Sequence, residues 1–368
     1  MERSKLLVWD EMNDRRYEGL PIIDCHTHIY DYDHFDRLAD NFKTYGFEAW
    51  NILSLSACGE EYIHQNILCM LMKLRYPEKT YAFGGLCYPS GETLTKENTM
   101  FDNQVKSLDQ MGFDGIKMIE GKPALRKKYR VPLDSSIYDD FFAYIEKEKI
   151  PVIYHVADPE AFWDKNAVPR FAFEAGWFYG DGSYPCKESL YSEAEGILKK
   201  FPQMKIIFAH FFFLSEDMQR AGEFLDKWPS ASVDITPGGE MFVGFSKCPQ
   251  KWRNFFIKYQ DRILFGTDND YGDSANIINS MRAFLETEKS YSYWGGDIQG
   301  IQLPMEVLEK IYYKNFLKYV TKAPKKVNIQ LLAEECGRVR EKIEKGLNKE
   351  KLLPVLYASQ EKLNVFKP

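Results

Sequence analysis

Eight short, mostly apolar runs recur along the chain at intervals of roughly 30 residues, the length of one strand, one helix and their loops. A strand that is buried on both faces of a parallel sheet reads as a continuous apolar run. The predicted strands are 22–26, 51–57, 81–87, 115–119, 152–156, 205–210, 232–236 and 263–268. Helical patterns fill most of the gaps, for example 61–74, 137–149, 189–201, 217–228 and 252–259. This alternation predicts an α/β protein, a (β/α)8 TIM barrel closed by a helix at 306–320.

An open, doubly wound sheet would also alternate strands with helices. Such a sheet usually carries a glycine-rich phosphate loop after its first strand. This chain has His26-Thr27-His28 at that position instead. The barrel is therefore favoured over the open sheet.

The barrel accounts for residues 21–321, preceded by a short polar lead-in at 1–20 and followed by a helical extension at 322–368. In the extension, Leu331, Leu332 and Val339 form an apolar seam. A long connection rich in aromatic residues follows the fifth strand, at 157–191. Loops of this length in a compact domain are often lids or binding loops. Its aromatic side chains either line a pocket or cover the barrel mouth or a subunit interface.

Composition and charge narrow the class of protein. The net charge of −6 and the pI near 5.7 argue against a nucleic-acid-binding protein or a protein that binds anionic membranes. The N-terminus has too short an apolar run for a secretory signal, and no stretch approaches the ~18–20 apolar residues that span a bilayer. The seven cysteines are scattered, as in proteins of a reducing compartment. We expect a cytoplasmic protein that acts on a small molecule, with a homodimer as its expected assembly.

Four of the six histidines fall at or just after the ends of predicted strands. His26 and His28 follow the first strand, and a spacing of two residues aims both imidazoles to one side. His155 and His210 end the fifth and sixth strands, and Asp268 ends the eighth. A barrel gathers these strand ends around one mouth, and three imidazoles with a carboxylate suit zinc or a similar divalent ion.

Each of these residues also has a simpler interpretation. His155 would then be an ordinary core histidine, and Asp268 would cap the turn that follows its strand. His210 is either a ligand or a neighbouring acid or electrophile. A strand-end carboxylate that is buried needs a compensating partner, which a metal would supply. The metal-site interpretation accounts for all of the strand-end positions at once.

Five segments carry a resemblance to a known family. They are IDCHTH at 23–28, GFDGIK at 112–117, PVIYH at 151–155, IIFAH at 206–210 and ILFGTD at 263–268. In this order the chain resembles the amidohydrolase superfamily, in the amidohydrolase-related branch that includes aminocarboxymuconate-semialdehyde decarboxylase-like enzymes. The resemblance implies that His26, His28, His155 and Asp268 hold one divalent metal, most often zinc and in some cases manganese. It places His210 beside that metal.

The fourth strand bears on the number of metal ions. Binuclear members of the resembled superfamily carry a bridging lysine or glutamate there, and this chain offers Lys117 and Glu120. Glu120 is expected either to reach a second ion or to be a rim carboxylate that contacts water or Lys122. One ion is the prediction.

Hydrolysis of an amide, ester or lactone is the expected reaction, with Asp268 moving the proton and His210 polarising the carbonyl. Non-oxidative decarboxylation of an aromatic or unsaturated acid is the alternative, because the same metal ligands would serve it. A substrate carboxylate would need a cationic clamp, and Arg126, Arg130 and Arg170 are the candidates near the mouth. A binding protein on a barrel that has lost catalysis is the third class, and loss of a metal ligand would mark it.

Overall fold

A computed structural model of the chain describes residues 19–89, 91, 93–238, 240–269, 274–345 and 349–365. Eight parallel strands lie side by side in chain order. They are β1 (Ile22–Thr27), β2 (Phe47–Leu53), β3 (Thr80–Gly85), β4 (Gly115–Gly121), β5 (Val152–Val156), β6 (Ile206–Phe208), β7 (Ala231–Asp234) and β8 (Ile263–Leu264). The order confirms the predicted (β/α)8 barrel.

Hydrogen bonds between the residues after β8 and strand β1 close the barrel. Cys25 N–H donates to Phe265 O at 3.0 Å, and Asp268 N–H donates to His26 O at 2.8 Å. Regular strand geometry ends at Leu264 rather than at 268, and Asp268 has a positive φ of 53°. The segment that follows β8 therefore lies directly against the end of β1.

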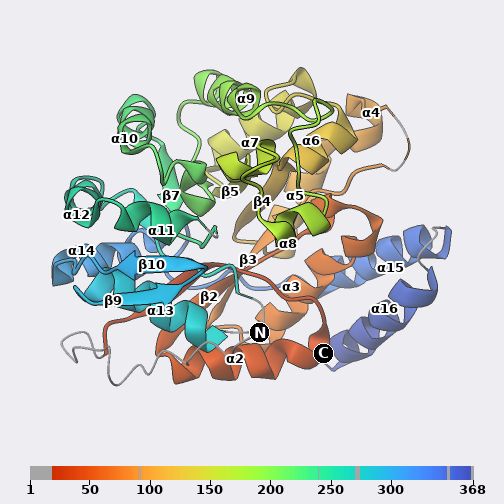
Figure 1. Ribbon diagram of the computed structural model, residues 1–368. Coiled ribbons are helices and arrows are strands. Elements are labelled where there is room, and N and C mark those ends of the chain that lie inside the picture. The colour runs from red at the N-terminus through yellow and green to blue at the C-terminus, as the bar shows by residue number, and fades with distance from the viewer. Residues whose placement is uncertain are drawn as a thin grey trace.

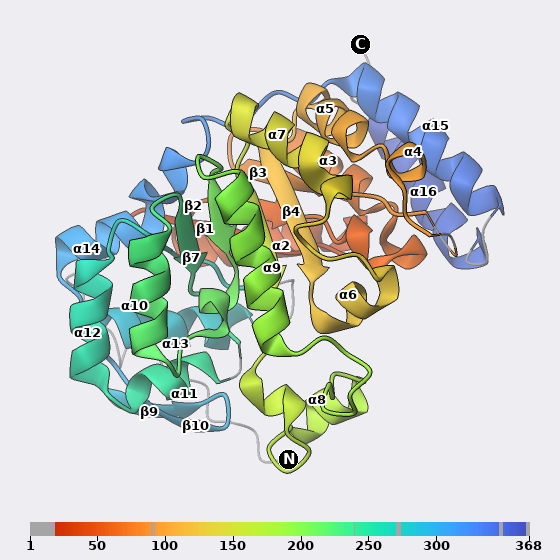
Figure 2. The same ribbon diagram turned by 90° about the horizontal axis from the view of Figure 1, so that it is seen from above.

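Helices surround the sheet on its outside (Figures 1 and 2). They are α2 (Phe35–Thr44), α3 (Gln65–Arg75), α4 (Lys96–Thr99), α5 (Phe101–Met111), α6 (Pro123–Tyr129), α7 (Asp139–Glu148), α8 (Arg170–Glu174), α9 (Lys187–Lys200), α10 (Met218–Lys227), α11 (Met241–Ser246), α12 (Pro249–Lys258), α13 (Ser274–Glu286), α14 (Met305–Glu309), α15 (Ile329–Lys345) and α16 (Lys349–Asn364). The predicted closing helix is divided into α14, a π-helical turn at Lys310–Lys314 and a 3₁₀ turn at Phe316–Lys318.

Two local features differ from the prediction. Strand β2 begins at Phe47 rather than at 51, because Gly46, with a φ of 75°, makes the turn that precedes it. A hairpin of β9 (Ser290–Tyr293) and β10 (Gly296–Gln299) also follows α13. Its two-residue turn, Trp294-Gly295, has positive φ at both positions, as a type I′ turn requires.

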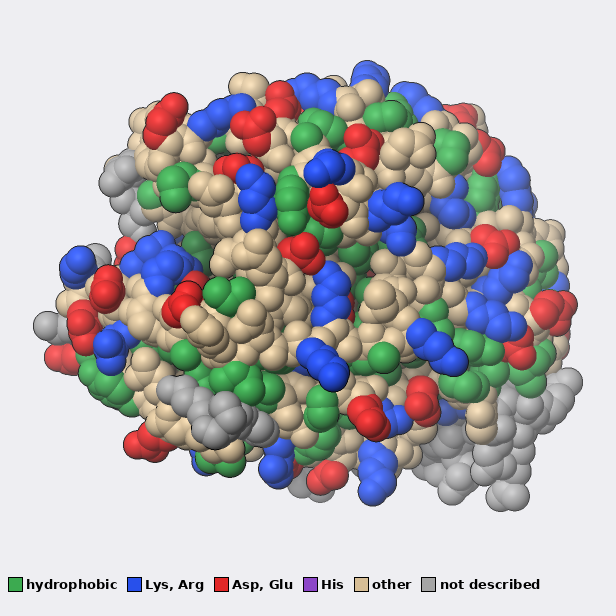
Figure 3. All heavy atoms as spheres, turned by 180° about the vertical axis from the view of Figure 1, so that it is seen from behind, with side chains coloured by type: hydrophobic (Ala, Val, Ile, Leu, Met, Phe, Trp, Pro, Cys, Tyr) green, Lys and Arg blue, Asp and Glu red, His purple; other side chains and the backbone are tan. Residues whose placement is uncertain are grey.

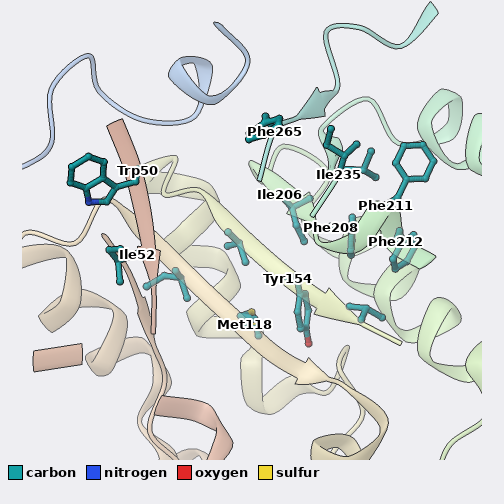
Figure 4. Packing of buried hydrophobic residues seen from close by; sticks show 14 of the residues in the cluster. Trp50, Ile52, Met118, Tyr154, Ile206, Phe208, Phe211, Phe212, Ile235 and Phe265 are labelled. Atoms are coloured by element: carbon teal, nitrogen blue, oxygen red, sulfur yellow. The ribbon is translucent and has the colours of Figure 1, made fainter. Parts of the chain in front are cut away.

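The strands separate two apolar layers. The inner cluster takes alternate strand residues and is Ile23, Cys25, Ala49, Leu53, Tyr81, Phe83, Ile153, Ile207, Ala209, Leu264 and Phe316. The outer cluster lies between the strands and the helices, and Figure 4 shows part of it, including Trp50, Met118 and Tyr154. Packing on both faces holds the strand ends at the mouth in fixed positions.

The C-terminal extension forms a helical pair that packs on the barrel's own helices. Helices α15 and α16 contact each other, α3 and α5, and they lie at one side of the barrel in Figures 1 and 2. Leu332 and Val339 are buried in this contact. Helix α3 is buried from Gln65 to Lys73, because barrel and extension cover opposite sides of it. Residues 1–18 of the predicted lead-in lie outside the described part of the chain.

The aromatic connection after β5 packs largely against itself. Phe162 and Tyr179 are buried in a small cluster with Ala172, and Trp163 and Trp177 pack on that cluster. Helix α9 already begins at Lys187, so the end of the predicted loop is helical. The connection is thus a folded segment of the chain with its own small apolar core.

On the face opposite Figure 1, basic and acidic side chains are interspersed (Figure 3). No helix within the described ranges is long and apolar enough to cross a membrane.

Candidate metal centre

His26, His28 and Asp268 converge at the mouth of the barrel. One side-chain ligand atom from each lies within 4.8 Å of the other two. His26 Nε2 is 3.4 Å from Asp268 Oδ1, and His28 Nε2 is 3.2 Å from the same oxygen. The two strand-end histidines and the eighth-strand carboxylate therefore share one point, as the spacing predicts.

The outer nitrogen of each imidazole is held by the protein. His28 Nδ1 lies 2.9 Å from Leu53 O, to which it donates, and His26 Nδ1 lies 2.9 Å from Asp234 Oδ2. With a proton on each Nδ1, both Nε2 lone pairs face Asp268. A hydrogen bond of this kind sets the tautomer and ring orientation of metal-binding histidines.

Asp234 is a site residue that the sequence interpretation did not identify. It is fully buried at the end of β7, where Oδ1 accepts hydrogen bonds from His210 N–H at 2.9 Å and Thr236 N–H at 3.1 Å. Burial would raise the pKa of Asp234, but the nearby His26 and these hydrogen bonds lower it below its ordinary value. Its signal in the sequence is an aspartate within the predicted strand 232–236.

Asp268 is the most accessible member of the group, with 37% of its side chain exposed. Burial would raise its pKa, but the interactions with the His28 and His26 imidazoles hold the pKa well below its ordinary value. The carboxylate is therefore ionised at neutral pH and faces the mouth.

His210 lies beside the group rather than in it. Its ring centroid is 5.4 Å from that of His26, and its Nδ1 lies 3.2 Å from Thr236 O. Burial, reinforced by the charge of His155, lowers the pKa of His210 to about 3, against the opposing effect of Asp268. His210 is thus neutral and presents the lone pair of Nε2.

His155 lies next to His210 rather than in the group of His26, His28 and Asp268. Its centroid is 4.8 Å from that of His210, and its Nε2 lies 3.3 Å from Asp158 Oδ1. Asp158 also accepts hydrogen bonds from Lys122 Nζ and, at 2.7 Å, from Tyr179 OH in the aromatic connection. The structure therefore brings His155 to the wall of the site but not into the compact group.

The two fourth-strand candidates lie in different surroundings. Lys117 Nζ is 3.2 Å from His26 Nε2, and burial lowers the pKa of this amine. Glu120 accepts hydrogen bonds from Tyr88 OH at 2.7 Å and from Ile119 N–H at 2.8 Å. Both Glu120 oxygens thus have protein partners, and Glu120 is not among the convergent ligands.

A left-handed turn of four non-glycine residues follows β6. The φ angles of His210, Phe211, Phe212 and Phe213 are 56°, 55°, 54° and 50°. This conformation costs roughly 1–2 kcal/mol per residue for L-amino acids. All four side chains are buried, so packing compensates for the backbone strain.

The residues present fit a divalent metal. Two imidazole nitrogens, each with its ring held by a hydrogen bond at Nδ1, and one ionised carboxylate are the ligand types that zinc binds. Among the described residues, this is the group whose His, Cys, Asp or Glu ligand atoms are close enough together to share an ion.

Comparison with known proteins gives a consistent picture. The family model for amidohydrolases matches residues 23–318. A search of curated proteins finds no match.

Solved structures with the same fold include 4-oxalomesaconate hydratase from Rhodopseudomonas palustris, at 14% identity and a TM-score of 0.52, covering 82% of this chain and 96% of that one. IDCase from Metarhizium anisopliae has 12% identity and a TM-score of 0.51, covering 84% and 99%. A TIM-barrel protein from Bordetella bronchiseptica has 14% identity and a TM-score of 0.51, covering 82% and 99%. At these identities the structural likeness establishes the fold alone. The family match spans the barrel and all the convergent residues, and the chain belongs to the amidohydrolase family.

Proposed function

We propose that the protein is a metal-dependent hydrolase that cleaves a small-molecule amide, ester or lactone. His26, His28 and Asp268 hold one divalent ion, for which zinc is the best match to the donors. The convergence of two oriented imidazoles on a partly exposed carboxylate is the observation that carries the proposal. His155 remains a predicted fourth ligand.

A divalent ion bound to these side chains would supply a water of lowered pKa and a Lewis acid for the substrate carbonyl. Asp268 is ionised and faces the mouth, so it can accept the proton of the attacking water and deliver it to the leaving group. Proton transfer by a positioned side chain of this kind commonly contributes ~10²–10⁴ in rate.

The hydrogen bond of His210 sets a condition on its expected role. Because its Nδ1 proton is donated to Thr236 O, neutral His210 offers only an acceptor at Nε2. It would polarise a substrate carbonyl only after taking up a proton, which the charge of Asp268 favours.

Two of the three predicted arginine clamps are engaged elsewhere, which favours hydrolysis over decarboxylation, and the third, Arg130, is an exposed residue at the end of α6. Arg126 forms a two-point hydrogen bond with Glu193, with both distances 2.9 Å, and Arg170 pairs with Glu174. These arginines are therefore already paired and less suited to clamp a substrate carboxylate.

Metal analysis and substrate cleavage test the proposal together. Protein purified without chelator should contain one divalent ion per chain, and His26→Ala should lose both the ion and activity while keeping its fold. His34→Ala is the matched control, because His34 pairs with Asp31 away from the centre. In a panel of amides, esters, lactones and aromatic carboxylates, the amides, esters or lactones should release acid and the carboxylates should remain unchanged. Release of carbon dioxide instead would establish the alternative, and lack of metal with no rebinding would exclude both reactions.

A further inference from the structure

A cavity with charged side chains in its wall lies close to His155 and His210. Its volume is 230 Å³, and its walls come from the segments that follow β5, β6 and β7. Phe213 belongs to this wall and also packs on the metal-site histidines, with ring centroids 5.2 Å from His210 and 5.4 Å from His155. One phenylalanine side chain therefore contacts both the cavity and the two histidines in the wall of the candidate site.

The two cations in the wall already have partners. Lys187 is 7% exposed, and its Nζ lies 3.3 Å from both Phe213 O and Glu160 Oε2. Arg220 donates two hydrogen bonds of 2.7 Å to Glu188. Neither cation is left to neutralise a further carboxylate.

Glu240 is the acid in the wall that lacks such a partner. Its Oε2 atom is buried and accepts no hydrogen bond from the described residues. Burial raises the pKa of Glu240 to about 7. By contrast, Glu216 forms an ion pair with Lys247, and Asp217 accepts a hydrogen bond of 3.0 Å from the backbone N–H of Arg220.

The charges around the cavity select the type of ligand. Four acids line it, Glu160, Glu216, Asp217 and Glu240, against two bases, Lys187 and Arg220. A buried carboxylate without a partner is stabilised most by a charged donor. The cavity's volume of 230 Å³ is below the ~300–1,000 Å³ of pockets that enclose whole ligands, so the cavity has room for one arm of a substrate.

We infer that this cavity binds a primary ammonium group of the substrate, with Glu240 Oε2 as the acceptor, while the scissile carbonyl occupies the metal centre. The inference rests on the proposed hydrolase function and gives it a substrate class, an amide or ester that carries a short aminoalkyl arm. Lys187 is already paired with Glu160 across 3.3 Å.

A pair of isosteric probes tests the inference. N-acetyl-1,4-diaminobutane carries an ammonium group where N-pentylacetamide carries a methyl group. Calorimetry with the metal-loaded protein should show the ammonium probe binding at least about tenfold more tightly, or ~1.4 kcal/mol. Equal binding of the two probes would overturn the inference without the need for any variant.

Glu240→Gln should abolish the preference for the ammonium probe while leaving metal content unchanged. Glu216→Gln removes a carboxylate from the same wall and should keep the preference, because Glu216 is paired with Lys247. If Glu240→Gln fails to fold, Glu240→Asp retains the charge on a shorter side chain and should weaken binding of the ammonium probe alone. A preference that survives in both variants would overturn the assignment.

Binding and cleavage distinguish this inference from the proposed function. If the ammonium probe binds in a Glu240-dependent manner but neither amide nor ester is cleaved, the hydrolase proposal fails and the cavity assignment stands. If uncharged esters are cleaved and the ammonium probe has no advantage, the cavity assignment fails and the hydrolase proposal stands.

Discussion

Asp234 orients His26 from behind, so its carboxylate should control the affinity for metal. In Asp234→Asn, the amide can still accept from the two backbone N–H groups, but its NH₂ cannot accept the Nδ1 proton of His26. We expect metal affinity to fall by ~10–100-fold with the fold intact. Equilibrium dialysis with zinc measures this effect.

Asp226→Asn is the control, because Asp226 is exposed and paired with Lys258. Equal metal affinity in the Asp234 and Asp226 variants would mean that His26 does not depend on its buried partner.

Glu240 should make stability fall as the pH rises. Burial raises its pKa from 4.5 to about 7, reinforced by Glu216 and Asp158 and opposed by Lys187. The folded protein then binds this proton more tightly than the unfolded chain, so the free energy of unfolding decreases between pH of about 4.5 and about 7. The loss is at most about 3 kcal/mol. Urea unfolding across this range should show a smaller decrease for Glu240→Gln, and an unchanged slope would contradict the assignment.

The site residues differ in how far the sequence predicts them. His26, His28 and Asp268 are predictable, because the period of a strand and the topology of a barrel bring them to one point. The partner of His155 is not predictable, because Asp158 reaches it from an irregular connection. Asp234 carries a signal, but an aspartate in a strand does not reveal which histidine it contacts.

At the scale of an element, the left-handed turn after β6 changes the expected stability of glycine variants. In an ordinary helix glycine is less stable than alanine, and in this turn it should not be. Phe212 packs against Phe208, Tyr191 and Phe224, with centroid distances of 4.3, 4.6 and 4.7 Å, and Figure 4 shows it near Phe208. Phe212→Ala should cost about 3–5 kcal/mol of unfolding free energy. Phe212→Gly should be no worse than alanine, because glycine adopts a φ of 54° without strain.

Chemical denaturation of both variants measures the difference. A glycine variant about 1 kcal/mol less stable than the alanine variant, as in an ordinary helix, would show that the turn is not left-handed.

The sequence predicts the strands better than this turn for a physical reason. Buried strands follow from apolar runs, whereas His210 to Phe213 contain no glycine or asparagine to indicate positive φ. The conformation arises from the packing of Phe211 and its neighbours, which depends on distant helices. The hairpin β9–β10 is a different case, because the sequence interpretation missed it although a glycine marks its turn at Trp294-Gly295.

At the scale of the whole molecule, the C-terminal helices are part of the barrel's core rather than an appendage. Val339 is fully buried where α15 meets α3 and α5. Val339→Asp should therefore lower the unfolding free energy of the whole chain by more than about 3 kcal/mol, since it buries an unpaired charge. Thermal unfolding with a single transition, shifted to lower temperature, is the expected result.

Arg340→Ala is the matched control on the same helix, because Arg340 is 42% exposed and should change stability by less than about 0.5 kcal/mol. A separate low-temperature transition in the Val339 variant would show that the extension unfolds independently. The homodimer stays a prediction, and the exposed Phe171 and Phe173 of the aromatic connection are one candidate surface for it.

The seam between β1 and β8 has a kinetic consequence. The candidate metal ligands are His26 in β1, His28 directly after it, and Asp268 four residues after the end of β8, and they come together where Asp268 N–H bonds to His26 O. Such a contact is among the most distant along the chain and carries a large loop-closure entropy, so we expect it to form late in folding. We therefore expect partly folded chains to lack the ion-binding point, and a bound ion would stabilise the closed barrel. Excess metal should slow unfolding, while leaving the early steps of folding unchanged.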